Sequence, residues 1–278
     1  MERTETAETP GAEAPGALLD GVPRQRGADA GSAAALPAGA VPVLEASGAE
    51  AVPAAGAVGT AGASGVPFPR VWRLVPTPTG TPFTFWYAVL LVVTSYVADA
   101  ADPSWVDGVL QASSTDVTHL VHAPALVLVA SALWVAGGLG SPFVAVFLLV
   151  LTALERRVGG VRTAAVFLTG HVVATLSTEV PVGLAVLVGH LPDSSLHRYD
   201  YGISFGVAAS VGALCGVLRP WVRWPVLVGF GGTLLQDLAN MADPVSNWGH
   251  VIALSVGVGL WGWVRRWNLE KVAGTPGS

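Results

Sequence analysis

The sequence predicts an all-α protein, a polytopic membrane helix bundle with a core of six transmembrane helices. Two observations predict this class. Hydrophobic residues make up 52% of the 278 residues and charged residues only 12%, and the mean hydropathy is +0.58, whereas a soluble domain needs more charge. Apolar runs also recur from Phe83 onward, each long enough at ~1.5 Å per residue to cross most of a ~30 Å hydrocarbon core.

The segment before these runs predicts a disordered cytoplasmic tail over residues 1–65. Ala, Gly, Pro, Glu and Thr dominate it, so it cannot bury enough apolar surface to offset the entropy of ordering. Its acidic start and the absence of an early apolar run argue against a signal peptide. Residues 66–82 contain Trp72 between Arg70 and Arg73, which predicts a juxtamembrane segment at the depth of the lipid headgroups.

The membrane domain is expected over residues 83–268, followed by a short C-terminal tail, 269–278. Its expected spans are 83–99, 141–157, 161–178, 201–218, 222–240 and 249–266. Residues 120–137 are apolar enough to form a seventh span.

The positions of Lys and Arg favour six spans over seven, because positive residues of short loops favour the cytoplasmic side. With 120–137 embedded in the outer face without crossing, only Arg198 lies outside. The cations that then lie inside, with the tail, are Arg156, Arg157, Arg162, Arg219, Arg223, Arg265, Arg266 and Lys271. The sequence therefore predicts a multi-pass membrane protein with a cytoplasmic N-terminus.

Charge and cysteine content argue against several kinds of partner. The formal net charge is -5 and the sequence has no long basic block, which argues against a nucleic-acid partner. The single cysteine, Cys215, lies in an apolar run and offers neither a disulfide framework nor a thiolate cluster. His119 and His122 lack the spacing of a metal site. We expect no metal and no cofactor, and the sequence leaves the oligomeric state open.

Two reactive residues fall at the outer ends of two expected helices. Ser204 lies at the start of the fourth span, and His250, 46 residues later, lies at the start of the sixth. That separation is the length needed to descend one helix, turn and return along another, so both side chains are expected at similar depth. A histidine at hydrogen-bond distance can take the proton of a serine hydroxyl, and a Ser-His pair suffices for acyl transfer.

Small residues below this pair predict that the two helices touch. Ala208, Gly212 and Gly216 recur at every fourth position below Ser204, and Ala253 and Gly257 follow His250. Stripes of this kind let membrane helices approach closely.

With these motifs the chain resembles the rhomboid intramembrane serine proteases, in particular divergent rhomboid-like proteins of high-GC actinobacteria. The family has a six-helix core, a Gly-x-Ser-Gly motif that opens the fourth span and a histidine that opens the sixth. Gly202-Ile203-Ser204 matches the first three motif positions. His250, with Gly257 seven residues later, resembles the histidine helix.

Further features support the resemblance over about residues 80–268. The run from Leu154 to Gly159, Leu-Glu-Arg-Arg-Val-Gly, resembles the family's Glu-Arg-x-x-Gly signature at the end of the second span. Ser131 and Trp134 fall where the family's embedded first loop carries similar residues. The resemblance therefore implies that Ser204 is the nucleophile and His250 the base, with Gly202 supporting the motif. It also implies that the protein lies in a bacterial plasma membrane.

The chain also departs from the family pattern. Phe205 stands where glycine normally follows the serine, and the second-span positions of the family's oxyanion-binding His and Asn fall near Leu139 and Phe143. Removing one oxyanion donor costs ~10²–10³ in rate. The candidate replacements are the backbone N–H of Ser204 and the side chain of His171, an ionisable residue inside the third span. Residues 180–196 form an insertion that has no counterpart in the minimal fold.

Two functions remain open. The first is a protease that cleaves transmembrane substrates with a Ser204–His250 dyad. The second is a catalytically inactive rhomboid-like protein that binds or escorts membrane clients. Each residue also has a structural reading, since serines in membrane helices commonly bond to a carbonyl one turn earlier, and His171 and His250 can serve packing alone.

Overall fold

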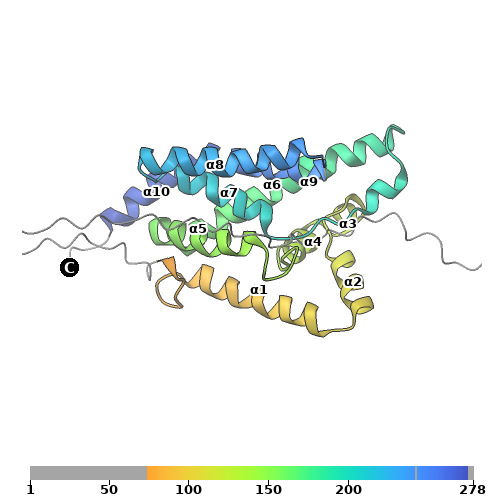
Figure 1. The fold of residues 1–278 in the computed structure, drawn as a ribbon, viewed down its shortest axis with the longest axis horizontal. Helices are drawn as coiled ribbons and strands as arrows, with labels where there is room; N and C mark the ends of the chain where they lie inside the picture. The colour runs from red at the N-terminus through yellow and green to blue at the C-terminus, as the bar shows by residue number, and fades with distance from the viewer. Residues whose placement is uncertain (1–73, 242, 275–278) are drawn as a thin grey trace, which may run out of the picture. The chain divides into compact units, whose positions relative to one another are not determined.

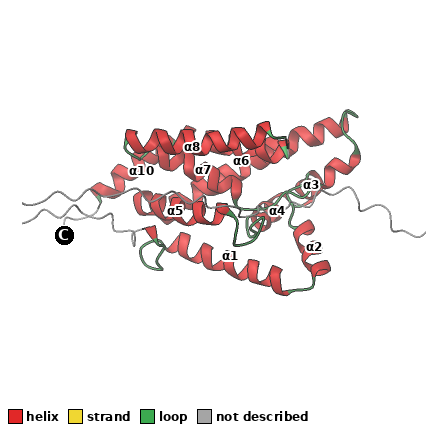
Figure 2. Ribbon diagram, viewed as in Figure 1, coloured by secondary structure: helices red, strands yellow, loops and turns green. Residues whose placement is uncertain are grey.

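The computed structural model describes residues 74–241 and 243–274, which belong to one compact unit, Ser64–Ser278. Every regular element of these residues is a helix (Figure 2), so the all-α prediction is confirmed for them. The expected tail, 1–65, and the first part of the juxtamembrane segment lie outside the described residues.

The helices follow one another along the chain, most of them with short connections (Figure 1). Their bounds are α1 Pro82–Ala100, α2 Pro103–Ala112, α3 Val117–His122, α4 Pro124–Ser131, α5 Pro142–Val158, α6 Gly160–Leu187, α7 Ser204–Cys215, α8 Pro220–Ala239, α9 Pro244–Gly259 and α10 Trp261–Ala273. A short 3₁₀ helix, Asp193–His197, lies between α6 and α7.

Helix α7 forms the centre of the bundle. Its residues from Phe205 to Cys215 are all buried, because α5, α6 and α9 pack around it. Helices α1 and α8 lie on opposite sides of this centre (Figure 1). The helix expected to open with the candidate nucleophile is therefore the one most enclosed by protein.

Helices α7 and α9 touch backbone to backbone, as the small-residue stripes predicted. A Cβ added at Gly257 would lie 2.0 Å from the carbonyl oxygen of Ala209, and one at Gly212 would lie 2.4 Å from that of Leu254. No side chain fits between the helices at either position. Close approach of these two helices is confirmed.

Residues 120–137 do not form one continuous helix. Helix α3 has 6 residues and α4 has 8, so at ~1.5 Å per residue neither crosses a ~30 Å core. Two hydrogen bonds tie the chain after α4 to α1: the Tyr87 hydroxyl donates to Ala132 O at 2.6 Å, and Thr94 Oγ1 donates to Leu133 O at 2.7 Å. We call residues 117–138 the α3–α4 loop.

Three expected boundaries differ from the structure. Helix α6 runs through Pro181 to Leu187, so about half of the expected insertion 180–196 continues the helix of the expected third span. The expected sixth span is divided at Leu260 into α9 and α10. Helix α10 also continues to Ala273, beyond the expected start of the tail at 269.

Among the described helices, only α1 and α6 combine the length and the apolar composition of a membrane crossing. Helix α7, with 12 residues, is shorter than the ~20 residues of a full span. The six-span arrangement therefore stays a prediction.

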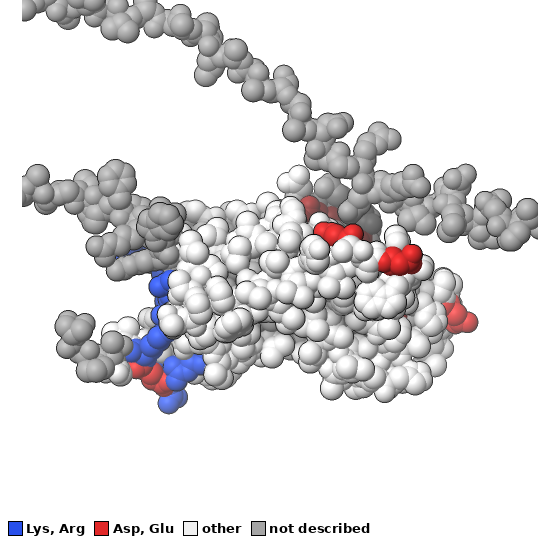
Figure 3. Space-filling view, turned by 90° about the horizontal axis from the view of Figure 1, so that it is seen from below, with Lys and Arg blue, Asp and Glu red and all other residues white. Residues whose placement is uncertain are grey.

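Charged side chains gather at opposite ends of the visible face in Figure 3, with Lys and Arg at one end and Asp and Glu mostly at the other. At the basic end, Glu155 of α5 caps the start of α1. Its carboxylate accepts from Phe83 N at 2.9 Å, Thr84 N at 2.8 Å and Thr84 Oγ1 at 2.7 Å, although its side chain is only 1% exposed. We call this end of the bundle, where α1 begins and α5 ends, the arginine end.

Candidate functional site

Ser204 is the first residue of α7, and the backbone before it is fixed by Gly202. Gly202 has φ 127°, a conformation that residues with a Cβ rarely adopt. Its N–H donates to Ser131 O of the α3–α4 loop at 2.9 Å. The glycine of the motif is thus explained by backbone geometry, and the loop sets the position at which α7 begins.

The N-terminus of α7 offers free backbone donors beside Ser204. No side chain caps this helix, and the first N–H groups of a helix have no intrahelical partner. Ser204 is half-buried. An anion formed next to its hydroxyl would lie at the positive end of the helix dipole.

His250 lies on α9 with its ring between two aromatic side chains. Phe143 of α5 stacks on it, with ring centroids 5.4 Å apart and an interplanar angle of 19°, and Phe205 of α7 meets it edge to face at 5.0 Å. The Nε2 atom is buried and has no hydrogen-bond partner among the described residues. The ring is therefore oriented by packing, and one polar atom is left unsatisfied.

Gly249 makes this packing feasible. A Cβ at Gly249 would lie 2.5 Å from Cζ of Phe205, so the ring occupies the space of a side chain on the facing helix. The bulky residue after the serine is therefore accommodated by a glycine directly before the histidine.

The structure places Ser204 and His250 on two touching helices, but no hydrogen bond joins them among the described residues. The catalytic pairing stays a prediction. Of the two positions at which the family pattern has oxyanion donors, Phe143 lies beside His250. Leu139 lies before α5 and is 43% exposed. Neither side chain can donate a hydrogen bond.

His171 of α6 contacts the α3–α4 loop. Its Nε2 lies 3.1 Å from Ser131 Oγ and 3.1 Å from Leu128 O, whereas its Nδ1 is buried without a partner among the described residues. The side chain is 2% exposed. These contacts give His171 a structural role in holding the loop, and its role as an oxyanion donor stays a prediction.

An ion-pair cluster that sequence reasoning missed holds the N-terminus of α9. Arg198 pairs with Glu179 of α6, and its Nη1 lies 3.4 Å from Asp243 Oδ1 and 3.3 Å from Ser246 Oγ. Asp243 itself caps α9 through Ser246 N. The signal was available, because a carboxylate such as Glu179 within an apolar helix predicts a partner or a function.

Asp200 anchors the segment that leads to Gly202. Its Oδ2 accepts from Thr115 Oγ1 at 3.0 Å, and its N–H donates to Ser114 Oγ at 2.9 Å. Burial raises the pKa of this carboxyl, and the nearby Arg198 opposes the rise. The segment just before the α3–α4 loop is therefore also joined to the approach to α7, four residues before the candidate nucleophile.

Within the described part of the chain, no group of three or more His, Cys, Asp or Glu side chains is placed to hold a metal ion. Comparison with known proteins shows that a family model described as rhomboid-like protein matches residues 78–268. No curated protein and no solved structure matches the chain.

Proposed function

The chain belongs to the rhomboid-like protein family, and on that premise we propose that this membrane protein is an intramembrane serine protease. Ser204 is the proposed nucleophile, and His250 the proposed base. One observation carries the proposal: the two residues lie on helices in backbone contact, and His250 Nε2 is buried without a partner among the described residues. A buried polar atom without a partner costs ~1–3 kcal/mol, a cost that a catalytic role explains.

In the proposed reaction His250 takes the hydroxyl proton as Ser204 Oγ attacks a substrate carbonyl carbon. The negative charge that forms on the carbonyl oxygen is stabilised by backbone N–H groups at the start of α7. His250 then gives its proton to the leaving amide nitrogen, and water releases the acyl group by the same steps. Phe143 and Phe205 hold the imidazole plane, a task that a carboxylate performs in serine-protease triads.

The proposed orientation places the arginine end in the cytoplasm, with the N-terminus on the same side. The charge distribution of Figure 3 supports it, since cytoplasmic loops carry an excess of Lys and Arg. Reporters fused within residues 185–198 and 242–247 should then both read as external. A cytoplasmic signal at either position would place Ser204 and His250 on opposite sides of the bilayer, and the dyad would be rejected.

Labelling with a fluorophosphonate or an isocoumarin tests the nucleophile without a known substrate. We expect labelling that is lost in Ser204→Ala and in His250→Ala. Ser210→Ala is the matched control, because Ser210 lies on the same helix and donates to Gly206 O at 2.7 Å. Equal labelling of native protein and Ser204→Ala would reject the protease.

The second candidate is a non-catalytic protein that binds or escorts transmembrane clients. The apolar side chains at Leu139 and Phe143 favour it, because both stand where the family pattern has hydrogen-bond donors. Phe143→Asn separates the candidates: a donor beside His250 should raise the labelling rate of a protease by ~10-fold or more. Labelling that stays absent in both proteins, with crosslinking to a single-span client retained in Ser204→Ala, would favour the client-binding function.

A further inference from the structure

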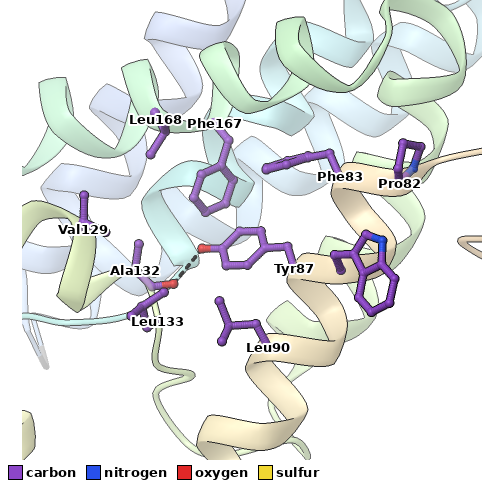
Figure 4. Close-up of a pocket in the computed structure, with 10 residues that line it drawn as sticks. Pro82, Phe83, Tyr87, Leu90, Val129, Ala132, Leu133, Phe167 and Leu168 are labelled. Carbon is purple, nitrogen blue, oxygen red and sulfur yellow. Dashed lines mark hydrogen bonds between the residues drawn. The ribbon is translucent and has the colours of Figure 1, made fainter. Parts of the chain in front are cut away.

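A cavity of about 540 Å³ lies between α1, the α3–α4 loop and α6. Neither Ser204 nor His250 lines it. Its volume falls in the ~300–1,000 Å³ range of small-molecule sites. Figure 4 shows side chains of all three segments around it. The walls include Phe83, Tyr87, Leu90, Leu133, Phe167 and Leu168.

The lining of this cavity is almost entirely apolar. The Tyr87 hydroxyl is already used, since it donates to Ala132 O at 2.6 Å (Figure 4). The remaining polar side-chain group of the lining is the indole N–H of Trp86, a residue that is 61% exposed. A polar ligand would find no free partner inside, whereas an alkyl chain gains from burial.

The α3–α4 loop lines the cavity on the side away from the arginine end (Figure 4). Its lining residues on α1 and α6 extend to Leu90 and Leu168, each eight residues after the helix start, a rise of ~12 Å. Ala132 and Leu133 of the α3–α4 loop form the far wall. This ~12 Å of lining covers less than half of a ~30 Å hydrocarbon core, so it suits the end of one acyl chain better than a transmembrane helix.

A cation, Arg156, lies near the part of the cavity that faces the arginine end of the bundle. Arg156 donates through Nη2 to Val75 O at 3.3 Å and lies 4.0 Å from a Cβ built at Gly80, two residues before Pro82 of the lining. Its Nε atom is buried and has no partner among the described residues. An anionic group at this position would pair with the charge of the guanidinium group.

We propose that the cavity binds one acyl chain of an anionic phospholipid from the leaflet at the arginine end, with its phosphate against Arg156. The chain tip contacts the same loop that receives the Gly202 N–H and the His171 ring. The bound lipid therefore stabilises the loop on which the start of α7 depends. This site does not rest on protease activity.

Photolabelling tests the acyl site in the full chain reconstituted in vesicles, with a phosphatidylglycerol that carries a diazirine in one chain. All variants carry Ser204→Ala, so the outcome is independent of catalysis. Leu168→Trp fills the cavity and should lower labelling of α1 and of the α3–α4 loop about tenfold, the loss expected for two displaced methylenes. Leu176→Trp is the matched control on α6, because Leu176 is 40% exposed against 46% for Leu168 and lies outside the cavity.

The headgroup contact is tested by comparing two lipids in the same variants. Arg156→Gln should lower labelling by phosphatidylglycerol about fivefold and leave labelling by a diacylglycerol with the same diazirine chain, which has no phosphate, unchanged, which also shows that the cavity persists. Arg219→Gln, at an exposed cation, should change neither. Equal labelling in Leu168→Trp and Leu176→Trp, or equal loss of both lipids in Arg156→Gln, would overturn the proposal.

Discussion

The contact between α7 and α9 makes a sharp prediction for Gly257→Ala. The added Cβ would lie 2.0 Å from Ala209 O and 2.8 Å from both Ala209 C and Ala213 N. All three are backbone atoms, so no side-chain rotation relieves the overlap. Carbon and oxygen rest ~3.3 Å apart in close backbone contacts, so the two helices must separate by about 1.3 Å.

The cost follows from overpacking, which destabilises cores by ~1–3 kcal/mol and occasionally more. Alanine also favours a helix by ~1 kcal/mol relative to glycine, which offsets part of that cost. Gly259→Ala is the control for the helix preference, because nothing lies within 4 Å of its built Cβ. We expect Gly257→Ala to be less stable than Gly259→Ala by about 2 kcal/mol, or about 4–8 °C in Tm.

The chain contains its own reporter for this measurement. Cys215 is the only cysteine and is 0% exposed on α7, so a fluorogenic maleimide should react with it only after unfolding. A thermal ramp in detergent then gives Tm for both variants. Equal Tm values for Gly257→Ala and Gly259→Ala would refute the backbone contact between α7 and α9.

Three further measurements test other parts of the structure. The native protein should resist maleimide at Cys215 at room temperature, and rapid labelling there would show that α7 is not enclosed. Glu155→Gln should destabilise by ~1–3 kcal/mol, since at least one donor at the start of α1 loses its acceptor; Glu270→Gln, at a half-exposed ion pair, should cost less than ~1 kcal/mol, and equal Tm values would contradict the buried cap. Because burial raises the pKa of Asp200, the folded state holds the carboxyl proton more tightly than the unfolded state does. The protonated carboxyl therefore stabilises the fold at low pH, and this stabilisation falls as the pH rises above about 4. Asp200→Asn should therefore flatten the fall of Tm with pH, and an unchanged slope would count against this burial.

The sequence by itself determined the helical class and the contact between α7 and α9. Both are local or periodic properties: apolar runs predict helices, and small residues at every fourth position share one helix face. It also named Ser204 and His250 as candidates, and it placed Gly202 at a motif position whose positive φ explains the glycine.

The surroundings of these residues were decided only by tertiary structure. Phe143, Phe205 and His250 come from three different helices, and Arg198 joins α6 to the start of α9. From the sequence alone, Phe205 was only a departure from the family motif. The glycine that leaves room for its ring, Gly249, lies 44 residues away. Helix bounds follow from neighbours along the chain, whereas the partners of a buried side chain depend on which distant segments pack against it.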